Sequence, residues 1–373
     1  TTQKPRPVIT AIADFYTHDN SNIHRGAHTL ARRATAAYED AREKIRRFIG
    51  ASTAEEIIFV RGATEAINLI AQSYGRTFLA PGEEIIISVL EHHSNLVPWQ
   101  LLCAEKKAVL RVIPITDEGE IILEEYARLL TAKTRLVAIP QVANSLGTVV
   151  PVKTMIEMAH SLGIPVLVDG AQGIPHFKVD VQDLDADFYA FSGHKLFGPT
   201  GIGVLYGKKA WLTEMPPWQS GGNMISNVTL SHTTFNSLPA KFEAGTGHLA
   251  GAVGLGAAVD YLSAIGSEKI ERYEENLLAY GTDALESIPK LHLIGTARRK
   301  AGVLSFVVAG LAAEQIGELL DRRGIAVRAG HHCAQPALRH FGLNSTVRAS
   351  VAFYNTRAEI DELVSALRTI IYQ

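Results

Sequence analysis

The chain has 373 residues, of which 47% are hydrophobic and 20% are charged. This composition is that of a globular protein with a sizeable core, and the length predicts one large domain with a smaller one. The formal net charge is −2 and no long basic run occurs, which argues against nucleic acid as the main partner.

Membrane and secretory signals are not visible in the sequence. No apolar stretch approaches the roughly 20 residues of a membrane span, and residues 1–10 lack the apolar core of a secretory signal. We therefore expect no membrane association. Only two cysteines occur, Cys103 and Cys333, far apart in the chain. Two isolated thiols are typical of a reducing compartment, so we expect the cytoplasm.

From about residue 55, short apolar runs alternate with segments of helical periodicity. The expected strands are Ile57–Val60, Glu84–Val89, Ala108–Pro114, Arg135–Pro140, Pro165–Val168, Phe188–Phe191 and Ile202–Tyr206. The expected helices between them are Glu65–Ser73, Val97–Lys106, Leu123–Leu130 and Met155–Leu162. Continuous apolar strands are typical of burial on both faces. The pattern therefore predicts an α/β fold with a mostly parallel sheet between helices.

The helical stretch Gly254–Ile265 is expected to close this large domain. From Glu268 a long helix leads into a second, smaller α/β unit. Its expected elements are Val303–Val308, Ala313–Arg322, Ile325–Val327, Thr346–Val351 and Arg357–Ile370. We expect three parts: residues 1–20 as a segment that packs with the smaller domain, residues 21–266 as the large domain, and residues 267–373 as the smaller C-terminal domain.

Polar side chains follow five of the expected strands, at the point where each strand ends. In parallel α/β sheets, ligands bind outside the carboxyl ends of the strands. The five polar segments are Arg61–Glu65, Glu91–Asn95, Val142–Asn144, Asp169–Gln172 and Ser192–Lys195. One polar loop is weak support for a site, but five at the same edge of a sheet predict a binding or catalytic site there.

Lys195 stands at the mouth of a buried strand, which is an unusual place for a cation. An unpaired buried ammonium costs several kcal/mol or loses its proton. A lysine in a Schiff base with an aldehyde cofactor has no free amine to bury. The alternative is a lysine that extends from the strand end into solvent. The neighbouring strand ends favour the first interpretation.

An aldehyde cofactor with a pyridine ring needs several groups beside its lysine. Asp169 can keep the ring nitrogen protonated, so that the ring remains an electron sink. His92 is placed to stack on the ring, and Gln172 and Asn144 can hydrogen-bond its phenolic oxygen.

The phosphate of such a cofactor needs hydrogen-bond donors. The amides of Ala63 and Thr64 begin an expected helix, and helix N-termini bind phosphate. The side chains of Thr64, Ser192 and His194 can add further donors.

These motifs resemble the group II (SufS-type) cysteine desulfurases, which are fold-type-I pyridoxal-phosphate enzymes. The matching stretches are Asn22–Gly26, Arg61–Asn68, Glu91–Asn95, Val168–Gln172, Phe191–Gly203, Arg328–Pro336, Arg348–Ser350 and Tyr354–Thr356. The resemblance covers essentially the whole chain. It implies the aspartate-aminotransferase-like architecture, with pyridoxal 5'-phosphate in the large domain, and a homodimer.

The resemblance also implies an enzyme, one that converts L-cysteine to L-alanine and leaves the sulfur on Cys333 as a persulfide. A sulfur-acceptor protein of the SufE type would take that sulfur for iron–sulfur cluster assembly. Lys195 is then the Schiff-base lysine and the base at Cα, and His92 stacks on the ring and handles protons. Arg348 binds the substrate carboxylate, a planar anion that suits a guanidinium.

Further roles come from the resemblance alone. Asn144, Arg25 and His24 line the substrate pocket, and Thr246 reaches the phosphate of the other subunit. Two departures from the family pattern occur. The chain begins inside an N-terminal motif, as expected either of a truncated chain or of a piece of a longer protein, and Gly247-His248 stands where Pro-Asn is usual.

Other interpretations of the cysteines are weaker. Arg328, His331 and His332 form an electropositive loop that favours a thiolate at Cys333, whereas Cys103 is expected in a helix core. His331, His332 and Cys333 are adjacent in the chain, so they cannot all face one metal ion. No CxxC pair accompanies them, and we therefore expect no metal site.

Rival functions are a selenocysteine lyase or another pyridoxal-phosphate-dependent C–S lyase, and a non-catalytic sulfur-relay scaffold. A kynureninase-like enzyme would have no use for the Cys333 thiol. The presence of Lys195, Asp169, His92 and Cys333 together argues against a scaffold that has lost catalysis.

Overall fold

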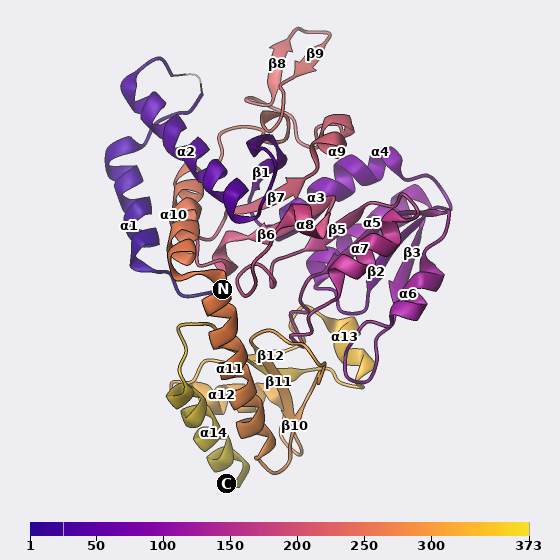
Figure 1. The fold of residues 1–373 in the computed structure, drawn as a ribbon, viewed down its shortest axis with the longest axis vertical. Helices are drawn as coiled ribbons and strands as arrows, with labels where there is room; N and C mark the ends of the chain where they lie inside the picture. Colours follow the sequence, from indigo (N-terminus) through magenta and orange to yellow (C-terminus); the bar gives the residue numbers. More distant parts are fainter. Residues whose placement is uncertain (25, 373) are drawn as a thin grey trace.

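The computed structural model describes residues 1–24 and 26–372. Arg25, one of the expected pocket residues, lies outside the described residues. The chain forms a large sheet enclosed by helices and a smaller sheet below it (Figure 1).

The large sheet has seven strands in the order β1-β7-β6-β5-β4-β2-β3. The strands are β1 (Ile57–Val60), β2 (Glu84–Ser88), β3 (Val109–Ile113), β4 (Thr134–Pro140), β5 (Val166–Asp169), β6 (Phe188–Ser192) and β7 (Gly203–Gly207). Among them β7 runs antiparallel to both of its neighbours, and the other described pairings are parallel. The expectation of a mostly parallel α/β sheet is confirmed.

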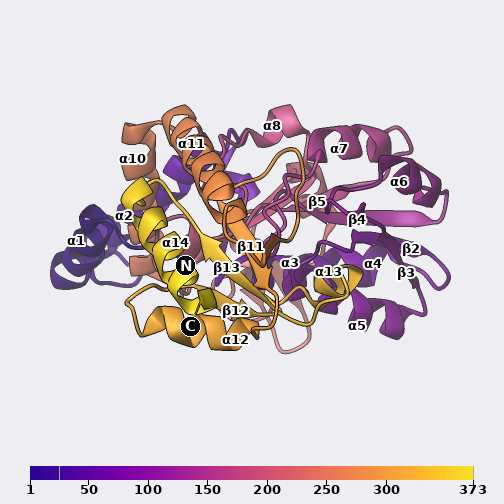
Figure 2. The same cartoon turned by 90° about the horizontal axis from the view of Figure 1, so that it is seen from below.

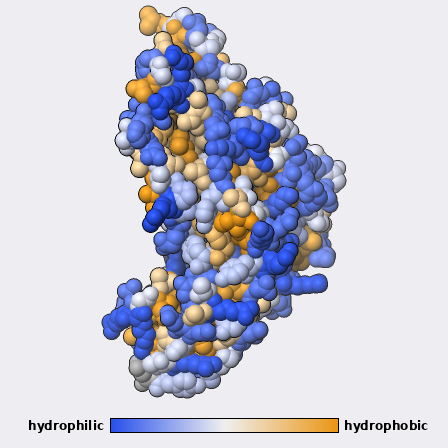
Figure 3. Space-filling model, turned by 60° about the vertical axis from the view of Figure 1, so that its left-hand side comes forward, coloured by the Kyte–Doolittle hydropathy of each residue, from blue (hydrophilic) through white to orange (hydrophobic). Residues whose placement is uncertain are grey.

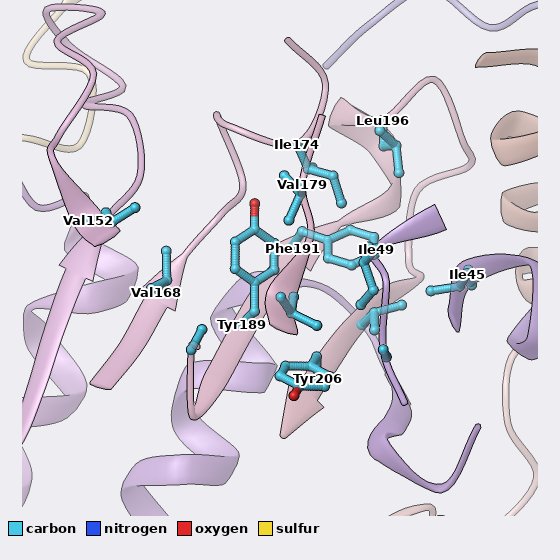
Figure 4. Close-up of a cluster of buried hydrophobic side chains, with 14 of the residues drawn as sticks. Ile45, Ile49, Val152, Val168, Ile174, Val179, Tyr189, Phe191, Leu196 and Tyr206 are labelled. Carbon is cyan, nitrogen blue, oxygen red and sulfur yellow. The ribbon is translucent and has the colours of Figure 1, made fainter. Parts of the chain in front are cut away.

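Helices cover both faces of this sheet, and each face has its own core. Along β5 the side chain of Val168 enters one core and that of Leu167 enters the other, because successive strand residues point to opposite faces. Figure 4 shows the first core, where Ile45 and Ile49 pack toward Phe191 and Tyr206. Two-sided burial explains why the strands read as continuous apolar runs.

The helices around the large sheet are α3 (Ala63–Ile70), α4 (Arg76–Phe78), α5 (Val97–Lys106), α6 (Leu123–Leu129), α7 (Val152–His160), α8 (Val181–Leu184) and α9 (Lys209–Glu214). Seen from below, α6, α7 and α8 lie on one side of the sheet and α4 and α5 on the other (Figure 2). Strand β3 is at the sheet edge, so Val109 and Val112 are exposed there, unlike the residues of the inner strands.

Three long helices pack at the β1 side. They are α1 (Arg6–Asp14), α2 (Thr29–Phe48) and α10 (Leu249–Ile265), and both α1 and α2 contact α10. Ala34, Tyr38, Ala41 and Ile45 recur every three or four residues along α2 and are buried. A side chain at Gly256 would meet Ala41 at 3.1 Å, so the two helices approach closely because this position lacks one.

The smaller sheet has the order β10-β11-β13-β12 and is antiparallel throughout its described pairings. Its strands are β10 (Leu291–Leu293), β11 (Val303–Val308), β12 (Arg328–Gly330) and β13 (Thr346–Ser350). Its helices are α11 (Ser267–Glu286), α12 (Ala313–Asp321), α13 (Gln335–His340) and α14 (Arg357–Tyr372). The expected element Ile325–Val327 is wrong: the chain turns at Gly324, with φ +75°, and the strand pairs from Arg328 opposite Arg348.

A hairpin of β8 (Ile225–Val228) and β9 (Thr233–Phe235) projects from the top of the molecule (Figure 1). Val228, Leu230 and Phe235 are exposed on it. Figure 3 shows a mainly hydrophilic face with hydrophobic side chains at this upper end.

No single helix among the described residues is long and apolar enough to cross a membrane, although α10 and α11, bent by 76°, together reach that length and composition. The division of the chain at residue 266 stays a prediction.

Candidate active site

A cavity of about 380 Å³ opens at the carboxyl ends of the large sheet's strands, where the smaller sheet faces them. Arg328, Arg348 and Ser350 contribute its wall from the smaller sheet. The expected residues that line it are Ala63, Thr64, His92, Asn144, Asp169, Gln172, Ser192, His194, Lys195 and Arg348. The structure thus brings together ten side chains from widely separated positions.

Lys195 ends a 3-10 turn that follows β6 directly. The turn is tight because the Gly193 amide donates to the Ile202 carbonyl at 2.9 Å, and a side chain at Gly193 would meet that carbonyl oxygen at 3.0 Å. Burial lowers the pKa of Lys195, and the charges of Arg348 and Arg328 act in the same direction. The lysine is therefore biased toward the neutral amine that a nucleophile or base requires.

Asp169 ends β5, next to β6, and is 7% exposed. Its Oδ1 accepts a hydrogen bond from the Ala171 amide at 3.0 Å. Burial raises the pKa of Asp169, while the Lys195 charge and the Ala171 amide oppose that rise. Asp169 is the carboxylate of the cavity wall, and its charge opposes the lowering of the Lys195 pKa by burial.

The start of α3 lines one side of the cavity. Ser192 Oγ accepts from the Ala63 amide at 2.8 Å, which ties β6 to this helix start. Thr64 Oγ1 lies 2.7 Å from Ser94 Oγ. His194 Nδ1 lies 2.9 Å from Thr1 Oγ1, and burial lowers the pKa of His194 to about 4. Amides, hydroxyls and a helix N-terminus make this side suitable for an anion.

Arg348 and Asn144 are joined and incompletely paired. Arg348 Nη1 donates to the Asn144 carbonyl at 2.7 Å, and Asn144 Nδ2 donates to the His332 carbonyl at 2.6 Å. Arg348 Nε and Asn144 Oδ1 are buried and have no partner among the described residues. Burial lowers the pKa of Arg348 to about 10. Such orphaned polar atoms are costly unless a ligand satisfies them.

Cys333 lies on a strained loop after β12. His332 and Cys333 have φ of +53° and +57°, a conformation that is uncommon for residues with a side chain. The His93 amide donates to the Cys333 carbonyl at 2.7 Å, and the Cys333 amide donates to His331 Nδ1 at 3.1 Å. Arg328 Nη2 is 3.5 Å from Cys333 Sγ.

The two thiols differ in their surroundings. Both are free and only Cys333 is partly exposed. Burial lowers the pKa of both Lys195 and Arg348, and Cys333 weakly opposes that lowering at each, so Cys333 lies near the cavity. Burial raises the pKa of Cys103 to about 11, so that thiol stays protonated.

Three of the expected residues that the structure describes, Cys333, Thr246 and His24, do not line this cavity. Thr246 lines a second cavity of about 710 Å³, together with Asn22, Gly247 and His248. His24 Nε2 bonds Glu39 Oε1 at 3.0 Å and lines neither of the two cavities. Arg25 lies outside the described residues.

Sequence reasoning gave no role to two residues that the cavity wall contains. Ser94 links Thr64 and His92, and His176 pairs with Glu274 from α11. Ser94 belongs to the same polar segment as His92, after the strand that ends near Val89, so the sequence could have indicated that Ser94 lines the cavity. Nothing in the sequence connects His176 with Glu274.

Comparisons with known proteins show which family the chain resembles. A profile of the Aminotransferase class-V family matches residues 1–363. A cysteine desulfurase of Synechococcus elongatus is 58% identical over 99% of this chain and 59% of its own length. A cysteine desulfurase of Pectobacterium carotovorum is 51% identical over 99% of this chain and 90% of its own.

Solved structures share the fold. The cysteine desulfurase CsdA of Escherichia coli, in its S-sulfonic acid form, superposes with a TM-score of 0.93 and is 42% identical, covering 99% of this chain and 92% of its own. The chain spans only 54–61% of the length of three of the curated relatives that it matches. With the family profile covering nearly all of the sequence, the chain belongs to the class-V aminotransferase family.

Proposed function

We propose that this chain is a pyridoxal-phosphate-dependent cysteine desulfurase of group II, which converts L-cysteine to L-alanine and takes the sulfur on Cys333. The observation that carries the proposal is one cavity that contains Lys195, Asp169 and Arg348, whose Nε has no partner among the described residues, with Cys333 beside Arg328 of the cavity wall. The names of relatives at 51–58% identity support the same activity.

The cavity fits the proposed cofactor. Lys195, with a lowered pKa, is the amine for a Schiff base, and Asp169 is the carboxylate for the ring nitrogen. Ala63, Thr64, Ser192 and His194 would hold the phosphate, with Gln172 and Asn144 near the ring's oxygen and His92 on its face. When bound, the cofactor supplies an electron sink for the carbanion formed at Cα.

The chain's own residues then bind and orient the substrate. Arg348 would bind the substrate carboxylate through its unpaired Nε, which removes the cost of that orphaned group. The neutral amine of Lys195 would take the proton from Cα. Asn144 accepts a hydrogen bond from the Arg348 guanidinium and donates one to the His332 carbonyl. These two bonds would fix the position of the smaller sheet relative to the large sheet around the substrate.

Sulfur transfer would fall to Cys333. Its thiolate would attack the substrate sulfur, so that a new S–S bond forms as the C–S bond breaks. The electron pair of the C–S bond would stay with the carbon fragment, which is then protonated to give alanine. Arg328 Nη2, 3.5 Å from Sγ, can stabilise the anionic sulfur. The partial exposure of Cys333 would let an acceptor protein of the SufE type remove the sulfur for iron–sulfur cluster assembly. The same residues could serve L-selenocysteine.

We further propose a homodimer in the cytoplasm. Thr246 would reach the phosphate of the partner subunit, and His24 and Arg25 would contribute to the substrate pocket. The support for a shared site is that Thr246 lines a cavity other than that of Lys195 within its own chain. A reducing compartment suits the two free thiols.

Replacement of Cys333 by Ser tests the proposal. A serine hydroxyl is hardly ionised at neutral pH and is a poor nucleophile toward sulfur. We expect the variant to bind L-cysteine, seen as a change in the cofactor absorbance, while alanine and sulfide formation fall by about 100-fold or more. The matched control is Cys103→Ser, which should keep the wild-type rate because Cys103 is buried in α5.

Sulfur labelling gives the direct readout. With ³⁵S-cysteine, label should appear on Cys333 and be released by added thiols. A Cys333→Ser protein that turns over L-cysteine at the wild-type rate would contradict the persulfide role and favour a simple C–S lyase.

A further inference from the structure

His92 is held at the cavity wall by a chain of short polar contacts. The Ser94 amide donates to His92 Nδ1 at 3.0 Å, and Ser94 Oγ lies 2.9 Å from the same nitrogen. Ser94 Oγ is also 2.7 Å from Thr64 Oγ1, at the start of α3. All three side chains line the cavity.

The backbone amide decides the tautomer of His92. A peptide N–H can only donate, so Nδ1 must present its lone pair to Ser94. In a neutral imidazole one nitrogen accepts and the other carries the proton, which therefore lies on Nε2. Protonation of Nδ1 would set two donors against each other at 3.0 Å. The contact thus disfavours both the other tautomer and the cation.

The surroundings act in the same direction. Burial, together with the charges of Lys195, His93, Arg328 and Arg348, lowers the pKa of His92 to about 4. Within the described residues, His92 Nε2 has no hydrogen-bond partner, so its proton is available to a molecule in the cavity.

We infer that Ser94 is a positioning residue that fixes His92 as a neutral ring with its proton on Nε2, so that His92 donates a hydrogen bond into the cavity and does not act as a base there. The identity of the molecules that fill the cavity, the cofactor and L-cysteine, rests on the proposed function. A ring that already carries hydrogen on Nε2 can accept no proton at that atom. Lys195 is then the group that carries the Cα proton, and His92 serves an oxygen or sulfur acceptor.

Nitrogen NMR of the imidazole rings tests the tautomer directly. The full chain, loaded with cofactor and labelled with ¹⁵N-histidine, would be compared with His92→Gln to assign the ring. From about pH 5.5 to about pH 8, we expect an unprotonated Nδ1 and a protonated Nε2, with no titration. A proton on Nδ1, or a cationic ring at neutral pH, would overturn the inference.

Ser94→Ala isolates the contribution of the hydroxyl. The variant keeps the backbone amide and loses the contact of Oγ with Nδ1 and with Thr64. We expect the same tautomer but a shifted Nδ1 resonance, because one of two polar neighbours of that nitrogen is gone. An unchanged Nδ1 resonance would contradict the part assigned to the Ser94 side chain.

Turnover provides the second readout. A glutamine at position 92 retains an N–H donor, whereas a phenylalanine retains only a planar ring. We expect His92→Gln to keep at least about 10-fold more kcat than His92→Phe, with His93→Gln as the matched control at the neighbouring histidine. Equal rates for the two His92 variants would reject hydrogen-bond donation. Because NMR needs no turnover, a protein with the expected tautomer but no alanine formation would reject only the proposed function.

Discussion

Asp169 and Lys195 act on each other across the cavity, and the charge of Asp169 is what limits the fall in the Lys195 pKa. Asp169→Asn removes that charge while preserving size. We expect alanine formation to fall by about 100-fold or more, because an amide cannot hold the ring nitrogen of the cofactor protonated. The matched control is Asp183→Asn on exposed α8, where the carboxylate pairs with Lys153.

The two variants should separate chemistry from folding. Far-UV circular dichroism and thermal unfolding should be close to wild type for both, so a lost rate reflects the site. A wild-type rate in Asp169→Asn would show that another group protonates the ring.

The sequence predicted the cavity residues that stand at strand ends, because parallel strands bring their carboxyl ends to one edge. Lys195, Asp169, His92 and Ala63 are of this kind. The sequence could not show hydrogen-bond partners that come from distant loops. The Asn144 contact with His332, and the partnerless Nε of Arg348, depend on how the smaller sheet docks.

At the scale of elements, Glu91 anchors the turn that leads from β2 to His92 and the 3-10 turn His93–Asn95. Its Oε1 accepts from the Ser88 amide at 3.1 Å, and its Oε2 accepts from Asn95 Nδ2 at 2.7 Å. Asn95 in turn accepts from Trp99 Nε1 at 2.9 Å. Burial outweighs these hydrogen bonds and raises the pKa of Glu91 to about 8.

That shift makes stability depend on pH. The unfolded chain releases the Glu91 proton near the ordinary value of 4.5, well before the folded protein does. The free energy of unfolding should therefore fall as the pH rises from about 4.5 to about 8. Glu91→Gln does not titrate and should lack this part of the fall. Urea unfolding at several pH values measures the free energy of unfolding of the wild type and of Glu91→Gln. If this free energy depends on pH in the same way in the two proteins, the raised pKa of Glu91 is contradicted.

Glu274 joins α11 to two loops near the cavity. From α11 it accepts the Phe353 amide at 2.8 Å with Oε1, and its Oε2 lies 2.7 Å from His176 Nδ1. Glu274→Ala leaves these two groups without a partner, and each should cost about 1–3 kcal/mol of unfolding free energy. Glu275→Ala, exposed on the same helix, is the control and should stay within about 0.5 kcal/mol of wild type. Equal losses in both variants would show that Glu274 holds nothing in place.

Element prediction succeeded for the strands of the large sheet but missed α1 and α2, although buried residues recur every three or four positions along α2. The strands of the large sheet were predicted to within one or two residues at each end, because buried apolar runs end in polar loops. The antiparallel direction of β7 follows from pairing and has no signature of its own. The β8–β9 hairpin was not predicted, because the apolar residues of β8, Ile225 and Val228, stand three positions apart and do not alternate as in a half-buried strand.

At the scale of the whole molecule, the proposed phosphate ligands are divided between two of the cavities that the described residues form. Ala63, Thr64, Ser192 and His194 line the Lys195 cavity, whereas Thr246 lines the second. If the proposed homodimer places Thr246 in the partner's site, each active site depends on residues from both chains.

Hybrid dimers test this arrangement. Lys195→Ala should abolish turnover by removing the Schiff-base amine and the Cα base, and Thr246→Val should weaken cofactor binding by removing a hydroxyl donor. In a dimer of one Lys195→Ala chain and one Thr246→Val chain, a shared site predicts that one of the two sites is fully wild type. That site combines the intact Lys195 of one chain with the intact Thr246 of the other. Differently tagged chains, co-expressed and purified as the hybrid, should therefore regain about half the wild-type kcat per dimer. If Thr246 instead serves its own chain, the hybrid would be no better than half of the Thr246→Val homodimer, and the proposed subunit-shared phosphate site would be rejected.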